Sequence, residues 1–78
     1  MHMGTVVGIN GIKIKVNAKD HNPPHCHVEG RGGSGRYDIY KMEWIEVSGY
    51  SKSDQTKLET VILAYIDEIR ELWSEYHE

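Results

Sequence analysis

The dipeptide Asn10-Gly11 constrains this chain most, because it separates two short runs of β-forming residues at 5–9 and 12–16. Asn-Gly best tolerates the two positive φ angles that a type I′ hairpin turn requires. The two-residue loop predicts three cross-strand pairs that share one face: Ile9 with Ile12, Val7 with Ile14, and Thr5 with Val16. This apolar face must be covered by another element.

Two prolines interrupt the segment after the hairpin. Pro23 and Pro24 exclude regular ladder pairing and fix an extended connection. Polar and apolar residues then alternate, which predicts a half-buried strand at 25–29 with Cys26 and Val28 facing inward. The outer face of this strand then carries three polar side chains: His25, His27 and Glu29.

The remaining β-type segments follow a glycine-rich stretch. Residues 30–35 predict a flexible hairpin loop, and two further strands are expected at 36–40 and 44–47. The second of these strands has Ile45 and Val47 on one face.

One long C-terminal helix is predicted from Ser51 onward. Ser51 is a good N-cap, and Asp54 three residues later meets the positive end of the helix dipole. The apolar stripe follows helical spacing: Leu58, Val61, Ile62, Tyr65, Ile66, Ile69, Leu72, Trp73 and Tyr76. Because this stripe is wider than one small sheet face needs, we expect a broad core helix, or else a homodimer or another partner protein on this helix.

These elements predict an α+β fold: a four- or five-stranded, mainly antiparallel sheet opening with a β-hairpin, with the helix packed on one face. Seventy-eight residues predict a single domain, 1–78. The single cysteine, Cys26, excludes an internal disulfide. We expect no membrane segment, and a cytoplasmic protein, because residues 1–4 lack the regions of a signal peptide.

Charge is divided unevenly along the chain. Residues 1–41 hold six Lys or Arg against three acids, whereas residues 42–78 hold three bases against nine acids. A basic, histidine-bearing first half predicts that RNA would approach the sheet face and not the acidic helix. The alternative is that these charged side chains only interact with water and bind no partner.

Three of the five histidines fall between residues 21 and 27, and one interpretation is a metal site. His25 and His27 project from the same face of a strand, so the two imidazoles can share one ion. The third ligand is left open among His21, Glu29 and Asp20. Zinc or nickel is the expected ion.

A metal-free interpretation makes His25 and His27 an acid and base pair, with His21 as a third member. Such a pair suits RNA cleavage, in which one histidine takes the 2′-hydroxyl proton and the other protonates the leaving oxygen. Nearby cations would bind the phosphate: Arg31, Arg36, Lys13 and Lys15. The structural alternative is that His21 and His25 hydrogen-bond the backbone of the proline turn, which leaves a non-catalytic docking module.

The string at 20–29, Asp-His-Asn-Pro-Pro-His-Cys-His-Val-Glu, resembles the signature of a bacterial family, domain of unknown function 4160. Its members carry His-x-Pro-Pro-His-x-His-Val between an opening hairpin and a C-terminal helix with a late Trp, here Trp73. The resemblance implies a small protein encoded beside another, as in toxin-antitoxin pairs. It therefore implies a small cognate partner protein, with RNA or DNA as a target.

Overall fold

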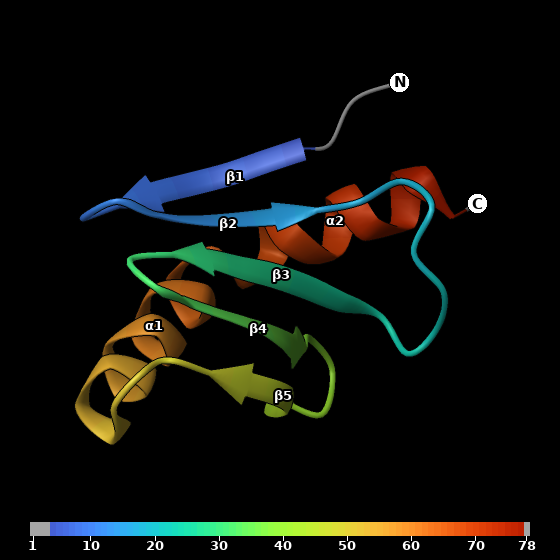
Figure 1. Cartoon of the computed structure of the whole chain (residues 1–78). Coiled ribbons are helices and arrows are strands. Elements are labelled where there is room, and N and C mark those ends of the chain that lie inside the picture. Colours follow the sequence, from blue (N-terminus) through green and yellow to red (C-terminus); the bar gives the residue numbers. More distant parts are fainter. Residues whose placement is uncertain (1–3, 78) are drawn as a thin grey trace.

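Five consecutive strands form one antiparallel sheet in the computed structural model, which describes residues 4–77. The strands are β1 (Gly4–Ile9), β2 (Ile12–Val16), β3 (His25–Gly30), β4 (Gly33–Asp38) and β5 (Glu43–Ser48). Their order in the sheet is the order in the chain, so β3 is the central strand. Both helices lie on one face of this sheet (Figure 1). The predicted α+β class and antiparallel sheet are confirmed.

The opening hairpin forms around the predicted turn. Asn10 and Gly11 have φ angles of 51° and 80°, and Ile9 pairs with Ile12 and Val7 with Ile14 as predicted. The predicted pair of Thr5 with Val16 is wrong. A register shift between Thr5 and Val7 moves Thr5 opposite Lys15, because a β-bulge adds an unpaired residue to one strand.

The predicted glycine loop at 30–35 is wrong. Only Arg31 and Gly32 make the turn, with φ angles of 54° and 81°, and β4 begins at Gly33. The glycines of β4 make room for aromatic rings: a Cβ on Gly35 would lie 2.9 Å from Cζ3 of Trp44. They serve close packing, and the strand is ordered by its ladders on both sides.

The boundaries of the last two strands also differ from the prediction. β4 ends at Asp38, not at residue 40, and β5 contains a second register shift that leaves Ile45 without a ladder partner. Trp44, not Ile45, packs against the core, where its ring meets Tyr37 edge-on at 5.0 Å between centroids. A one-residue shift in register exchanges the side chains on the two faces of a strand.

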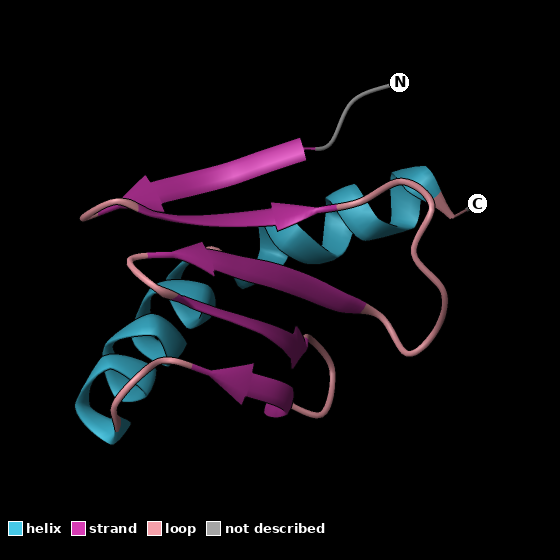
Figure 2. Cartoon of the chain, in the orientation of Figure 1, coloured by secondary structure: helices cyan, strands magenta, loops and turns pink. Residues whose placement is uncertain are grey.

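The single long helix of the prediction is wrong, because the chain forms two: α1 (Lys52–Ala64) and α2 (Ile66–Tyr76). Tyr65 breaks the helix at φ −111° and ψ 16°. A straight helix over both spans would measure about 37 Å, whereas five strands span only about 19 Å. The break keeps both helices on the sheet face (Figure 2).

The core lies between the sheet and the helices. The predicted N-cap is confirmed, since the Ser51 hydroxyl accepts a hydrogen bond from the main-chain N–H of Asp54 at 3.1 Å. The predicted stripe supplies the helical part of the core: Leu58, Ile62, Ile69 and Trp73. In the part of the chain that the structure describes, neither helix has the length and apolar character that crossing a membrane requires.

Candidate functional site

Strand β3 places two imidazole rings side by side. His25 and His27 are two residues apart, and their ring centroids are 5.0 Å apart with an interplanar angle of 65°. Side chains at this spacing leave a strand on the same face, here the face away from Cys26 and Val28 in the core. The predicted same-face pair is confirmed.

The predicted exposure of His25 to solvent is wrong. His25 is 3% exposed, whereas the side chain of His27 is 24% exposed. The ring centroid of His25 lies 5.5 Å from that of Trp73 on α2. The ring is also hydrogen-bonded to the main chain of Pro23, in the connection between β2 and β3, and these contacts exclude water. Only His27 offers an edge to solvent.

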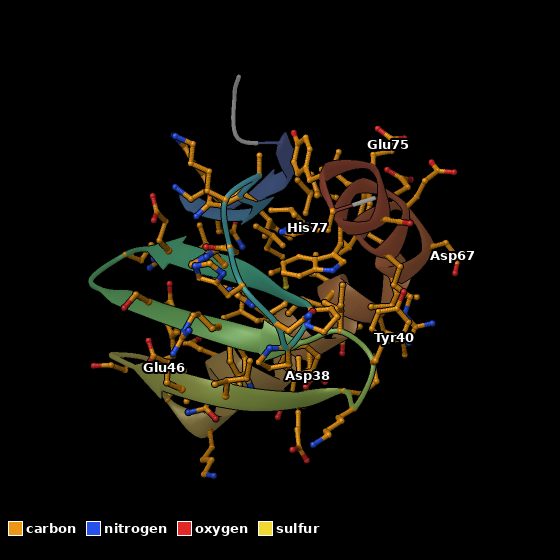
Figure 3. All side chains as sticks on the ribbon, turned by 90° about the vertical axis from the view of Figure 1, so that its right-hand side faces the viewer. Asp38, Tyr40, Glu46, Asp67, Glu75 and His77 are labelled. Atoms are coloured by element: carbon orange, nitrogen blue, oxygen red, sulfur yellow. The ribbon has the colours of Figure 1, made fainter. Side chains whose placement is uncertain are left out.

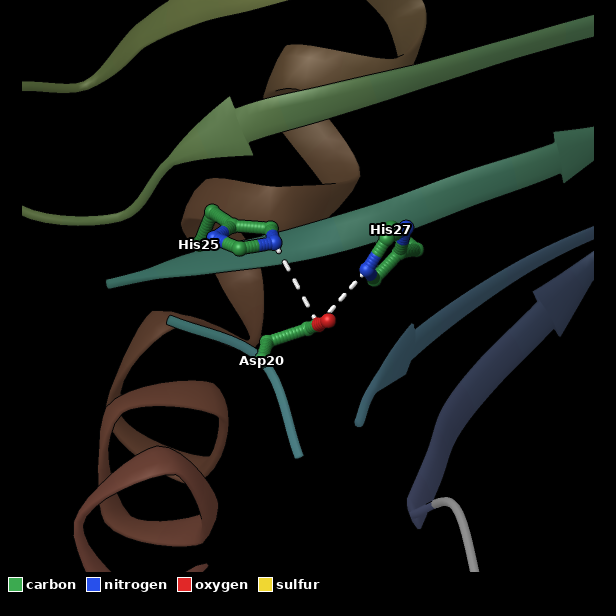
Figure 4. A group of neighbouring side chains, drawn as sticks. All are labelled: Asp20, His25 and His27. Carbon is green, nitrogen blue, oxygen red and sulfur yellow. Dashed lines mark hydrogen bonds and ion pairs between the residues drawn. The ribbon is translucent and has the colours of Figure 1, made fainter. Parts of the chain in front are cut away.

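Asp20 completes the cluster from the connection between β2 and β3. Its Oδ2 lies 2.6 Å from Nε2 of His27 and 3.3 Å from Nε2 of His25 (Figure 4). Among the described residues these three form a group whose potential metal-ligating atoms all lie within 4.8 Å of one another. We name Asp20, His25 and His27 the Asp-His-His cluster.

The two nitrogens of His25 have different surroundings. Nδ1–H donates to the main-chain oxygen of Pro23 at 2.8 Å, which fixes the proton of a neutral ring on Nδ1. Nε2 is buried and has no hydrogen-bond partner, although it faces the Asp20 carboxylate. The ring therefore presents an unsatisfied nitrogen to the centre of the cluster.

The C-terminal end of α2 holds Asp20 in place. The ring of His77 stacks on that of Trp73 at 3.8 Å between centroids, and its Nε2 contacts the main-chain oxygen of Asp20 at 2.6 Å. His77 lies at the end of the helix in Figure 3. The sequence analysis missed this residue, because nothing local relates it to a loop 57 positions earlier.

A buried carboxylate, Asp38, is the cross-strand neighbour of His25. Burial raises its pKa, but hydrogen bonds from the main-chain N–H groups of Lys41 and Tyr40 outweigh this and hold the pKa below its usual value. Asp38 therefore stays ionised at neutral pH, where it cannot donate a proton. Its role is to accept the hydrogen bonds that shape the turn after β4.

Cys26 lies between the two histidines in sequence but faces the core. Burial raises the pKa of its thiol to about 12, so no thiolate forms near neutral pH. Cys26 lies in the core, as predicted.

The other predicted ligands are placed apart from the cluster. His21 is exposed, and Glu29 forms an ion pair with Lys15 at 2.9 Å, which lowers the pKa of its carboxyl. The structure groups neither His21 nor Glu29 with His25 and His27, and Asp20 takes the third place.

The predicted phosphate-binding cations separate into two sets. Lys15 and Arg36 are the cross-strand neighbours of His27 on either side, and Lys13 lies two pairs further along, opposite Glu29. Arg31 follows Gly30, at the end of β3 opposite to His25, and does not lie beside the cluster.

Fold and cluster together define a small α+β protein with an Asp-His-His site at one end of its central strand. Residues 11–74 match the model of a protein family described as a domain of unknown function, DUF4160. The chain therefore belongs to the DUF4160 family, as its resemblance predicted. No curated protein and no solved structure gives a significant match to the chain.

Proposed function

We propose that this protein binds one divalent transition-metal ion, with zinc expected first, through Asp20, His25 and His27. The observation that carries the proposal is the buried Nε2 of His25, which has no hydrogen-bond partner and faces a carboxylate oxygen.

The hydrogen bonding of His25 explains why a cation fits there. With Nδ1–H donating to Pro23, the neutral ring turns the lone pair of Nε2 toward the negative oxygen of Asp20. A buried lone pair without a donor is unfavourable, and a neighbouring carboxylate increases the cost. A cation between the two groups removes this repulsion, as a proton on Nε2 also would. Metal-ligating histidines usually donate their other N–H to a carbonyl, as His25 does.

The spacing of the donor atoms suits a tetrahedral ion. Bonds of about 2.0–2.1 Å to zinc require donor atoms about 3.3 Å apart. Oδ2 of Asp20 lies 3.3 Å from one histidine nitrogen and 2.6 Å from the other. The potential donor atoms all lie within 4.8 Å of one another, so rotation of the side chains is needed to bring all three to bonding distance.

The donor types favour zinc or nickel over magnesium or calcium. Two imidazole nitrogens and one carboxylate oxygen suit transition metals, whereas magnesium and calcium prefer oxygen ligands only. Three protein ligands also leave one position open, as in catalytic zinc sites.

The test is a metal titration of the tag-free chain after chelator treatment and dialysis. Cobalt(II) is added as a spectroscopic probe and zinc as its competitor, and elemental analysis then gives the zinc content. We expect one equivalent of metal per chain, and a d–d absorption band that zinc removes.

Substitutions separate this cluster from other histidines. Asp20→Asn, His25→Gln and His27→Gln should each lose stoichiometric binding, whereas the matched controls His21→Gln and Glu29→Gln should keep it. Stoichiometric binding that survives His25→Gln combined with His27→Gln would overturn the proposal, as would the absence of binding to the unmodified chain.

We propose as a second candidate function that an RNA phosphate binds beside this cluster. Lys15 and Arg36 flank His27. The exposed ion pair of Arg36 with Glu46 can be replaced by a phosphate at little cost, and the Lys15 side chain, 12% exposed, pairs with the exposed Glu29. Glu46 lies on the side of the sheet away from α2 (Figure 3).

The RNA proposal is tested by filter binding and cleavage assays with and without zinc. Lys15→Gln combined with Arg36→Gln should weaken RNA binding about tenfold or more, while Lys41→Gln, an exposed control, leaves it unchanged. Equal RNA binding by both variants would contradict a phosphate site. The toxin-like role, the cognate partner and the homodimer stay predictions.

A further inference from the structure

A hollow lies at the opposite end of β3 from the Asp-His-His cluster. Its volume is about 350 Å³, and it lies between the β1–β2 turn, the β3–β4 turn and the first turns of α1. Its apolar lining comes from Ile12, Leu58 and Val61, and its charged lining from Arg31, Asp54 and Lys57. Ligand pockets span about 300–1,000 Å³, so this hollow is of a size for a small molecule.

The backbone of Arg31 is held in an unfavourable conformation at this hollow. Arg31 has a φ of 54° in a two-residue turn, and the corresponding position of the other two-residue turn holds Asn10 at 51°. Left-handed backbone costs roughly 1–2 kcal/mol for most residues, and Asn adopts it more readily than Arg. The turn therefore carries a side chain that its own geometry disfavours.

The two turns are packed so that the Arg31 side chain has room. A Cβ on Gly30 would lie 2.2 Å from the main-chain oxygen of Gly11, so the turns touch through their backbones. A Cβ on Gly11 would lie 3.5 Å from Cγ of Arg31, so the Arg31 side chain lies along Gly11. The Arg31 side chain therefore passes along the β1–β2 turn at the hollow.

The charges of the hollow are not matched within the protein. Over the described residues, Arg31, Lys57 and Asp54 form no ion pair with a protein group. Two cations and one carboxylate above an apolar floor give a net positive charge. We propose that this hollow binds a small apolar carboxylate, with the anion on Arg31 and Lys57 and the apolar group on Ile12, Leu58 and Val61.

This proposal is independent of the metal site. It concerns another surface and other side chains, and Asp54 adds a further distinction. If the ligand is an α-amino acid, its ammonium group faces Asp54. If it is a simple carboxylic acid, Asp54 contributes nothing to binding.

The experiment is a titration of the ¹⁵N-labelled full chain followed by amide chemical shifts. The probes are leucine, 4-methylpentanoate, which lacks the ammonium, and 3-methylbutylamine, which lacks the carboxylate. We expect the two carboxylates to shift amides of the two turns and of α1, with a Kd of about 0.1–1 mM, and the amine to shift none. Tighter binding of leucine than of 4-methylpentanoate identifies the amino acid as the preferred source.

Arg31→Asn is the decisive variant, because it removes the cation and relieves the backbone at once. It should melt at the same temperature as the unmodified chain or higher, keep its zinc binding, and bind the carboxylates at least tenfold more weakly. Lys57→Gln should also weaken binding, and Lys41→Gln should not, because Lys41 follows the opposite end of β4 and does not line the hollow. The absence of amide chemical-shift changes at ligand concentrations up to 20 times the expected Kd would overturn the proposal. So would equal binding of the amine, or unchanged carboxylate binding by Arg31→Asn.

Discussion

Zinc should raise the melting temperature of the metal-free chain through the Asp-His-His cluster. In the folded protein the three ligands lie on β3 and on the connection before it. In the unfolded chain the same ligands are not held together, so the metal binds the folded state preferentially.

The size of the effect follows from binding linkage. At a free zinc concentration 100 times Kd, the free energy of unfolding rises by about 2.7 kcal/mol. The unfolding entropy is about 2.1 cal/mol/K per residue, so a chain of 78 residues should gain about 16 °C in melting temperature. Zinc binding by histidines of the unfolded chain lowers this value.

The assay is thermal unfolding followed by circular dichroism, with zinc varied and magnesium as the control ion. Asp20→Asn should remove most of the zinc-dependent gain, because it replaces a charged ligand by a neutral amide. His21→Gln should keep the gain, since His21 is exposed and outside the cluster. Equal stabilisation of Asp20→Asn and the unmodified chain would refute the reasoning, as would equal stabilisation by magnesium.

Three further predictions concern single side chains. Because burial raises the pKa of Cys26 to about 12, the thiol should resist a disulfide reagent at pH 8 until urea unfolds the chain, and rapid labelling of the native protein would contradict this. Asp38→Ala should lower the free energy of unfolding at pH 7 by about 1–3 kcal/mol, because two turn amides lose their acceptor. The pKa of Asp38 is lowered by folding, so its contribution is present above the unfolded pKa of about 3.9 and is lost as pH falls through the folded value. Urea titrations at pH 7 and pH 3 measure the difference, and an equal loss at both pH values would count against it. His77→Ala should weaken zinc binding about tenfold in a cobalt competition assay, because it frees the main chain of Asp20, and an unchanged affinity would exclude this positioning role.

The parts of the fold that depend on neighbouring residues could be predicted from the sequence. The turn at Asn10-Gly11 needs only two residues that tolerate positive φ, and the cap at Ser51 needs only an acceptor three residues before an N–H. The same-face relation of His25 and His27 follows from the two-residue period of a strand.

The parts that depend on distant residues could not be predicted. The helix break at Tyr65 carries no Pro or Gly and follows from the size of the sheet beneath it. The burial of His25 depends on Trp73, and the position of Asp20 depends on His77, both from the other end of the chain. The third member of the cluster therefore stayed open in the sequence and was assigned only by the fold.

The cluster takes its members from two kinds of element. His25 and His27 lie on the central strand, where ladders to β2 and β4 fix the spacing of their main chains, whereas Asp20 lies on a connection whose main chain is contacted by His77. Two imidazole nitrogens and one carboxylate oxygen favour an ion that accepts mixed nitrogen and oxygen ligands, which describes zinc better than magnesium.

The coordination position that three ligands would leave open on the proposed metal faces one side of the cluster. His27 is the more exposed histidine, and Lys15 and Arg36 are its neighbours, so a ligand that reaches the metal from solvent meets two cations on the way. The metal and phosphate proposals thus describe one site. Arg31, at the hollow, lies four residues after His27 beyond the other end of β3, roughly 13 Å away at about 3.3 Å per residue. At this distance substitutions act independently. The double variant Arg31→Asn with His27→Gln should therefore lose as much carboxylate binding as Arg31→Asn alone and as much zinc binding as His27→Gln alone. A larger or smaller combined effect would mean that β3 transmits a change between its two ends.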